Sequence, residues 1–201
     1  MSSTGKVTRV QPVPQDLHIH TTFSHADTAI APEQTVELIA QLRHARVTGI
    51  SDHLDCLLDG GDLEGYTRAV RAAGFHLGTE VAGSKWVSAA LDLPFEYYVY
   101  HCMNREEEYR GFERLMASGK PAIIAHPLAM GTDLDKLPAD CLVEINNRYI
   151  WRNNWRERFA PHVKRFRFVM SSDAHQPNWL NQVIARYVAS ELGIRETILF
   201  S

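Results

Sequence analysis

Seven short runs of residues with β-strand character recur along the sequence, and windows of helical character lie between them. The strand-like runs cover residues 16–21, 47–51, 75–80, 97–101, 122–126, 141–146 and 166–172. Helices are predicted over 32–45, 63–73, 104–118, 149–163 and 178–191, a loop over 127–140, and a hairpin arm over 81–94. Such alternation is typical of β-α units that build a mainly parallel sheet. We therefore expect an α/β fold.

The chain is long enough for one domain, because 201 residues match the usual size of roughly 100 to 200 residues per domain. We expect residues 1–15, with Pro12 and Pro14, to be an exposed lead-in, and residues 16–201 to form the single domain. The opening residues lack the apolar core of a signal peptide, and no stretch approaches the roughly 18 apolar residues of a membrane span. A soluble protein with no membrane partner is predicted.

Charge and cysteine content exclude several other classes. With 21 basic and 24 acidic side chains, the formal charge of −3 creates no overall field that would attract nucleic acid or anionic lipid. Cys56, Cys102 and Cys141 are odd in number and lack C-x-x-C spacing, which argues against a disulfide framework and against a thiolate zinc site. A cytoplasmic location is the best match. The ten histidines, by contrast, stand out.

Polar residues that can bind metal or act in catalysis lie at or just beyond the end of each strand-like run. They are His18 and His20, Asp52 and His53, Glu80, His101, His126, Glu144 and Asn146, and Asp173 and His175. Parallel strands direct their carboxyl ends to one face of a barrel or open sheet, so these side chains should meet there. The pleat also places His18 and His20 on one strand face, with Asp16 one step deeper as a carboxylate that could fix a ring tautomer.

A single histidine in a strand is more often a hydrogen-bonded core or surface residue than a metal ligand. This structural interpretation becomes weaker when seven histidines all lie at or just beyond the end of a predicted strand. His44, His76 and His162 lie in helical or strand-entry positions with no matching acidic neighbour, and we assign them to structural roles. The other seven histidines are predicted to share one site.

Several motifs follow one another in a recognisable order: DLHIHTTFSHAD, GISDH, GTE, YH, IAHP, EIN and SDAH. In this order they resemble the PHP (polymerase and histidinol phosphatase) family of metal-dependent phosphoesterases. The resemblance extends from Asp16 to about His175, and D-x-H-x-H together with S-D-A-H is its most specific part. It implies a distorted (β/α)7 barrel with two to three zinc, manganese or iron ions at the C-terminal ends of the strands.

The resemblance also implies a ligand set for a trinuclear metal site. Its nine positions correspond to His18, His20, His25, His53, Glu80, His101, His126, Asp173 and His175. One metal would be held by His18, His20, Glu80 and Asp173, a second by Glu80, His101 and His126, and a third by His25, His53 and His175. Asp27 is a rival to His25. A set dominated by imidazoles suits zinc, iron or manganese better than magnesium or calcium.

Clustered divalent cations that share a carboxylate suit the hydrolysis of phosphoesters, because adjacent metals can clamp the attacking and leaving oxygens. Metal binding lowers the pKa of water to roughly 7, so a metal-bound hydroxide is the expected nucleophile. The leaving alkoxide would be protonated by a metal-bound water, by Asp52 or by His175. Asp52 could equally orient a ligand histidine.

A basic segment over residues 148–167 carries a local charge of +6, from seven cationic side chains and Glu157. If 149–163 is helical, Arg148, Arg152 and Arg156 form one row beside a row of aromatic side chains. An ordinary amphipathic helix explains that pattern equally well. Only Arg148 lies close to a strand end, directly after EINN, so we expect Arg148, together with Asn146, to bind the substrate phosphate.

Three functions remain open. The first and preferred one is hydrolysis of a small phosphorylated metabolite, such as histidinol phosphate, a nucleotide or a sugar phosphate. The second is a 3'-5' exonuclease that trims nucleic acid, which the charge of −3 and the lack of a groove-binding segment disfavour. The third is a metal-binding module without catalysis. Short segments at 54–74 and 81–94 predict an open mouth, and the oligomeric state cannot be read from the sequence.

Overall fold

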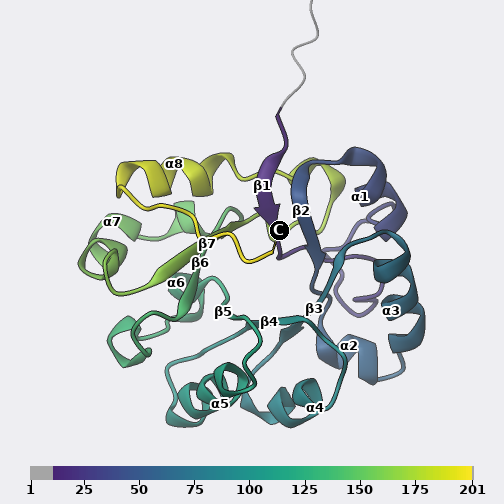
Figure 1. The fold of residues 1–201 in the computed structure, drawn as a ribbon, viewed down its shortest axis with the longest axis horizontal. Coiled ribbons are helices and arrows are strands. Elements are labelled where there is room, and N and C mark those ends of the chain that lie inside the picture. Colours follow the sequence, from purple (N-terminus) through teal and green to yellow (C-terminus); the bar gives the residue numbers. More distant parts are fainter. Residues whose placement is uncertain (1–10, 201) are drawn as a thin grey trace, which may run out of the picture.

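Seven parallel strands lie side by side in chain order in the computed structural model, which describes residues 11–200 (Figure 1). They are β1 (Val13–Asp16), β2 (Ala45–Ile50), β3 (His76–Val81), β4 (Tyr97–Tyr100), β5 (Ala122–Ile124), β6 (Leu142–Asn146) and β7 (Arg167–Ser171). Each strand pairs in parallel with the next. The predicted α/β class and parallel sheet are confirmed.

The two edges of the sheet approach each other through the chain that follows β1 and β7. Ile19 forms a parallel bridge with Ala174, the Asp173 N–H donates to the His18 carbonyl at 2.8 Å, and the His20 N–H donates to the Ala174 carbonyl at 3.0 Å. These bonds nearly close the sheet into a seven-stranded barrel. They also bring the segments that carry the first and last predicted site residues into direct contact.

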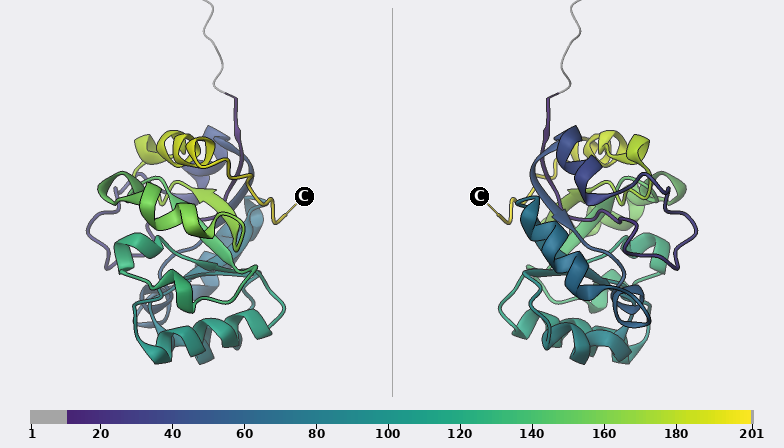
Figure 2. Two further views of the ribbon diagram at one scale, coloured as in Figure 1. Left: turned by 90° about the vertical axis from the view of Figure 1, so that its left-hand side faces the viewer. Right: turned by 90° about the vertical axis from the view of Figure 1, so that its right-hand side faces the viewer.

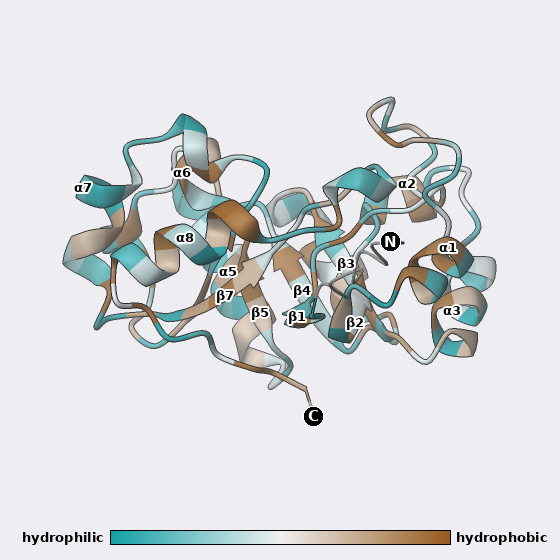
Figure 3. Ribbon diagram, turned by 90° about the horizontal axis from the view of Figure 1, so that it is seen from above, coloured by the Kyte–Doolittle hydropathy of each residue, from teal (hydrophilic) through white to brown (hydrophobic). Residues whose placement is uncertain are grey.

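Helices surround the barrel on the outside, as two perpendicular views show (Figures 1 and 2). They are α1 (Val36–Leu42), α2 (Leu54–Leu58), α3 (Leu63–Ala72), α4 (Val87–Leu91), α5 (Glu106–Ala117), α6 (Pro127–Met130), α7 (Trp155–Phe159) and α8 (Val183–Glu191). Hydrophobic and hydrophilic residues are interspersed along α1, α3 and α8 (Figure 3), as expected for helices with one face against the sheet. Among residues 11–200, no helix combines the length and the apolar character needed to cross a membrane.

Three connections differ from the prediction. The loop expected over 127–140 contains α6 and a 3-10 helix, Leu134–Lys136. Residues 81–94 form no hairpin arm but a 3-10 turn and α4, because Val87 and Ala90 lie one turn apart and bury the same helix face. The predicted helix over 149–163 is broken into three short pieces, η3 (Ile150–Arg152), α7 and η4 (Ala160–His162). Asn153 adopts an extended conformation between the first two pieces, so Arg148, Arg152 and Arg156 do not form a continuous helical row.

The first strand begins earlier than the predicted domain boundary. Val13, inside the predicted lead-in, donates its N–H to the His44 carbonyl at 2.9 Å and pairs with Ala45 of β2. Pro14 is compatible with this strand because successive N–H groups point to opposite sides, and the nitrogen of Pro14 faces away from β2. The boundary expected at residue 16 therefore lies within β1.

The hydrophobic core has two parts, which the alternation of strand residues separates. On β4, Tyr98 and Tyr100 pack with the helices, whereas Tyr97 and Val99 join a smaller cluster inside the barrel. The Tyr97 hydroxyl donates to the Leu17 carbonyl at 2.8 Å. The segment before the C-terminus packs Leu199 and Phe200 against this interior cluster. The interior and this segment fill the barrel at the amino ends of the strands, which leaves the carboxyl ends for a site.

Candidate metal centre

Glu80, close to the end of β3, is the centre of a buried group of histidines. His101 Nε2 lies 2.5 Å from its carboxylate, His53 Nδ1 lies 2.8 Å away, and His18 Nε2 lies 3.1 Å away. His20 Nε2 at 3.4 Å and His126 Nε2 at 3.5 Å complete the group. Glu80 itself is only 1% exposed. Five imidazoles from four different strand ends therefore surround one carboxylate.

Four sets of side chains in this region have ligand atoms close enough to hold a metal ion. They are His18, His20 and Glu80; Glu80, His101 and His126; His18, His126 and Asp173; and His20, His53 and His175. Two sets share Glu80, so its two carboxylate oxygens can serve neighbouring ions. The first three sets contain the residues that the sequence grouped as the first and second metal positions.

The chemistry of His18 shows why these residues suit a cation. Glu144 Oε1 lies 2.7 Å from Nδ1 of His18 and accepts the proton of that nitrogen, so in the neutral ring the other nitrogen presents a lone pair. That Nε2 faces carboxylate oxygens of Glu80 at 3.1 Å and of Asp173 at 3.7 Å. Three acceptors that converge on one point require a proton or a metal ion between them. The donor set therefore fits a divalent metal.

The pKa values of the cluster reflect this convergence. Burial lowers the pKa of His18, but Glu144, Asp173 and Glu80 together raise it well above its usual value. Burial raises the pKa of Glu80, yet His101, His18 and His53 hold it well below the ordinary carboxyl range. Burial and the nearby His53 lower the pKa of His20. Without metal, protons bound to some of these imidazoles would balance the buried carboxylates.

Two of the cluster residues have unusual backbone geometry. His126 and Asp173 have positive φ angles of 25° and 53°, a region that non-glycine residues rarely adopt. His126 lies two residues beyond the end of β5 and precedes Pro127, and Asp173 lies two residues beyond the end of β7. Strained backbone of this kind is concentrated at functional sites, where the surrounding structure holds a side chain in place.

The third predicted metal position differs from the implied ligand set. Neither His25 nor Asp27 belongs to the four sets, but His25 is exposed whereas Asp27 reaches the side of the cluster formed by His53 and His175. Asp27 Oδ2 lies 2.9 Å from His175 Nε2 and 3.3 Å from His53 Nε2. The chain turns sharply after His20, with the Ser24 N–H bonded to the Thr21 carbonyl, and this turn directs residue 27 rather than 25 inward. The structure thus places Asp27, and not His25, beside His53 and His175.

Asp52, a predicted acid or orienting residue, lies away from the open side of the cluster. Its carboxylate accepts hydrogen bonds from the Thr21 N–H at 2.7 Å, the Thr21 hydroxyl at 2.5 Å and the Ser24 hydroxyl at 2.6 Å. Burial raises the pKa of Asp52 to about 6, against the opposing effect of these hydrogen bonds. The carboxylate is fully buried and anchors the loop after β1, so the structure does not support its role as a proton donor to a leaving group.

The structure gives Asp16 and Asn146 different roles from those predicted. Asp16 Oδ2 faces His44 at 3.1 Å, and its other oxygen accepts the Ser172 N–H, so it does not orient His18. Asn146 is 2% exposed and donates to both Glu144 and Asp173 at 3.0 Å. Its carbonyl oxygen accepts the Arg148 N–H. Because all its polar groups bind the protein, Asn146 supports neighbouring residues and has no free group for a substrate.

The interpretation of the three remaining histidines also needs a correction. Each has an acidic neighbour after all, although outside the cluster. His44 pairs with Asp16, His76 Nδ1 lies 2.8 Å from Glu96, and His162 lies 4.0 Å from Asp135. Such partners are distant in sequence, up to 28 residues for His44, which is why the local pattern did not show them.

Arg148 is the basic residue that reaches the cluster from the 148–167 segment. Its Nη1 lies 2.9 Å from His175 Nε2 and 3.6 Å from Asp173. Burial lowers the pKa of His175, and Arg148 adds to that effect, while Asp173 opposes it. Two other cations of the segment point elsewhere: Arg156 pairs with Glu191, and Arg165 donates to backbone carbonyls.

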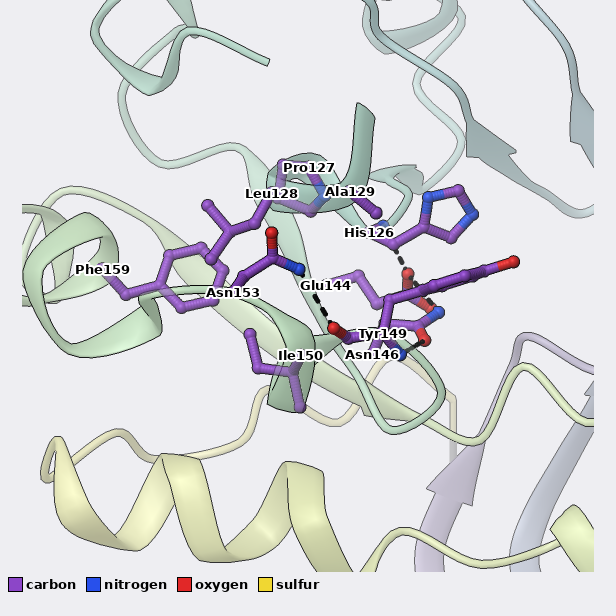
Figure 4. A pocket seen from close by; sticks show the side chains of 10 residues that line it. All are labelled: His126, Pro127, Leu128, Ala129, Glu144, Asn146, Tyr149, Ile150, Asn153 and Phe159. Carbon is purple, nitrogen blue, oxygen red and sulfur yellow. Dashed lines mark hydrogen bonds between the residues drawn. The ribbon is translucent and has the colours of Figure 1, made fainter. Parts of the chain in front are cut away.

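A pocket of about 450 Å³ opens over the cluster. Its walls combine candidate ligands with neighbouring side chains: Asp27, His53, Glu80, His101, His126, Ala129, Met130, Arg148, Tyr149, Asp173 and His175. Tyr149 packs against the His126 ring with a centroid distance of 5.0 Å, and Figure 4 shows the two rings beside Glu144 and Asn146. Tyr149 and the supporting role of Glu144 were missed by sequence reasoning. The two-residue spacing from Glu144 to Asn146 on one strand face was the available signal.

Comparison of the sequence with protein-family models and with curated proteins found no match.

Proposed function

We propose that the protein is a metal-dependent phosphoesterase of the PHP type that hydrolyses a small phosphorylated metabolite. The observation that carries this proposal is the shared carboxylate: Glu80 belongs to two of the potential ligand sets, with His18 and His20 on one side and His101 and His126 on the other. A bridging carboxylate is the usual way to hold two cations close together, and paired cations suit displacement at phosphorus. When bound, zinc, manganese or iron would activate water and neutralise phosphoryl oxygens.

The protein's own residues have separate tasks in this proposal. Glu144 holds the His18 ring through Nδ1, so that Nε2 remains free to bind a cation. Arg148 lies beside the cluster, with its charge 3.6 Å from Asp173, where it can bind a phosphoryl oxygen. In the reaction, the oxygen of water bonds to phosphorus, the ester P–O bond breaks, and the leaving alkoxide takes a proton. His175 lines the pocket, but its Nε2 lies 2.9 Å from the Arg148 guanidinium and its pKa is lowered, so we propose that the proton on the leaving alkoxide comes from the attacking water.

Reconstitution with single metals tests the proposal. The protein is stripped with a chelator, reloaded separately with manganese, zinc or iron, and assayed for bound metal and for hydrolysis of 4-nitrophenyl phosphate and its bis ester. We expect bound metal and turnover with at least one of the three. Glu80→Gln should lose both, because a neutral amide is a poor bridging ligand. His76→Ala provides the matched control, since it removes a histidine from the opposite end of the same strand.

Two results would count against the proposal. If no metal supports turnover of either ester, the protein is not a phosphoesterase of this type. If Glu80→Gln keeps the full metal content and activity, the shared carboxylate is not the basis of the site. Preference for the monoester or the bis ester decides between phosphomonoesterase and phosphodiesterase.

A further inference from the structure

A second pocket lies next to the metal cluster and shares two walls with it. It has a volume of about 380 Å³, and Arg148 and Tyr149 line both pockets. Its other principal walls are Trp151, Arg152 and Trp179. If the phosphate of a substrate lies at the cluster, the leaving group, which is bonded to the other side of the ester oxygen, would therefore lie in this second pocket.

The walls of this pocket are aromatic and cationic. The Arg148 guanidinium lies over two aromatic rings, 5.0 Å from the centroid of Tyr149 and 5.2 Å from that of Trp179. Arg152 lies 4.8 Å from the centroid of the Trp151 ring. Three aromatic side chains and two guanidinium planes thus border one pocket. Flat side chains of these kinds stack on planar rings, and arginine adds attraction for an electron-rich ring.

Charge narrows the class of ligand further. No carboxylate is among the residues that line this pocket in the part of the chain that the structure describes, whereas two arginines are. An amino alcohol would bring a positive charge next to Arg148 and Arg152 with no acidic partner, at an electrostatic cost. A leaving group without positive charge fits better.

An amide at the rim offers hydrogen bonds to a ligand. Asn181 lines the pocket, and its own side-chain bonds are long: 3.3 Å from Asn147, 3.4 Å to the Asn178 carbonyl and 3.4 Å from the Val183 N–H. Bonds at that limit are weak, so the amide can exchange them for the donors and acceptors on the edge of a nucleobase. A simple phenol or a sugar would use the stacking walls or the amide but not both.

From these contacts we propose that the second pocket binds a nucleoside as the leaving group of the substrate. This proposal rests on the phosphoesterase function proposed above and specifies its substrate class as nucleoside phosphates. The Trp151 side chain is 57% exposed, so it is accessible to a ligand and can be replaced with little effect on the core.

Binding of the leaving group itself provides a test that does not depend on catalysis. Calorimetry on the metal-reconstituted protein compares adenosine with ribose, which lacks the base. We expect adenosine to bind about 10-fold tighter than ribose or more, because the stacking of one base on an aromatic side chain raises the binding affinity by about that factor. Trp151→Ala and Arg152→Glu should each weaken adenosine about 10-fold. Tyr187→Ala is the matched control, because Tyr187 is 54% exposed on the nearby α8 but does not line the pocket, and it should leave the affinity unchanged.

Kinetics then connect the pocket to the reaction. The ratio of kcat/KM for AMP to that for ribose 5-phosphate should exceed about 10 in the wild type and fall in Trp151→Ala and Arg152→Glu. The proposal is overturned if adenosine binds no tighter than ribose, even if phosphoesters are hydrolysed. It is also overturned if Tyr187→Ala lowers the affinity for adenosine as much as Trp151→Ala or Arg152→Glu does. Adenosine that binds as expected while 4-nitrophenyl phosphate is not hydrolysed with any metal supports the nucleoside pocket and overturns the phosphoesterase function instead.

Discussion

Glu144 lies on β6 and His18 on the segment after β1, 126 residues apart in sequence, yet the Glu144 carboxylate approaches Nδ1 of the His18 ring to 2.7 Å. The same carboxylate accepts the His126 N–H at 2.5 Å and bonds to the Ser171 hydroxyl. Glu144 thus holds two predicted ligands in place, His18 through its ring and His126 through its backbone N–H. Burial raises the pKa of Glu144, but His18, His126 and the Ser171 hydroxyl together lower it to about 2, so the carboxylate remains ionised at neutral pH.

Replacing Glu144 should weaken metal binding without removing any ligand from the cluster. In Glu144→Gln the His18 ring loses its charged partner, and we expect the affinity for zinc to fall about 10- to 100-fold, the usual effect of losing a residue that orients a metal-bound histidine. Competition with a chromophoric chelator measures this affinity, with His76→Ala as the control. An affinity equal to that of the wild type would show that Glu144 does not orient His18.

The third metal position should depend on Asp27 and not on His25. Asp27 lies 2.9 Å from His175, whereas His25 is exposed. We expect Asp27→Asn to lower the number of ions retained after reconstitution and gel filtration, and His25→Ala to leave that number unchanged. Metal analysis of both variants beside the wild type gives the answer. The reverse result would restore the ligand set that the sequence resemblance implies.

Asp52 should make the metal-free protein less stable as the pH rises. Its folded pKa of about 6 lies above the ordinary value of 3.8, so its contribution to stability is complete below about pH 4 and is lost as the pH rises through about 6. The loss is at most about 3 kcal/mol, at 1.36 kcal/mol per pKa unit. Asp52→Asn removes this titration. Its free energy of unfolding in urea should therefore improve relative to the wild type between pH 4 and pH 7.

Parallel pH profiles for the wild type and Asp52→Asn would contradict that prediction. Measurements on chelator-treated protein are needed, because cations held by His53 would change the charge next to Asp52. The asparagine keeps the shape of the side chain and can still accept the Thr21 N–H and the Ser24 hydroxyl proton.

Gly78 should be essential for packing inside the barrel. A Cβ at this position would overlap the ring of Tyr97, and one at Gly49 would approach the same ring from β2. We expect Gly78→Ala to lower the free energy of unfolding by about 3 kcal/mol, at the upper end for overpacked cores. In the background of Tyr97→Leu, which removes the ring, the same substitution should cost at least about 1 kcal/mol less. Additive effects in chemical denaturation would show that the ring is not the obstacle.

Much of the fold was predictable because hydrophobic periodicity is local. Strands β2 to β7 appear where their apolar runs predict them, with ends displaced by at most two residues. The strand β1 lies earlier, and the predicted run at 16–21 forms the segment that closes the barrel. The helix over 149–163 was wrong because Asn153 takes an extended conformation that helical spacing does not reveal. The arm at 81–94 was wrong because Val87 and Ala90 bury one helix face.

Part of the candidate site could likewise be predicted from the sequence, and part could not. The types and order of His18, His20, Glu80, His101 and His126 were sufficient to predict one cluster, because parallel strands bring their carboxyl ends together whatever the details of packing. The choice of Asp27 over His25, the support of His18 by Glu144, and the wall that Trp179 adds beside Arg148 depend on how loops turn and on which distant strands are neighbours. Those relationships join residues far apart in sequence, so only the tertiary structure decides them.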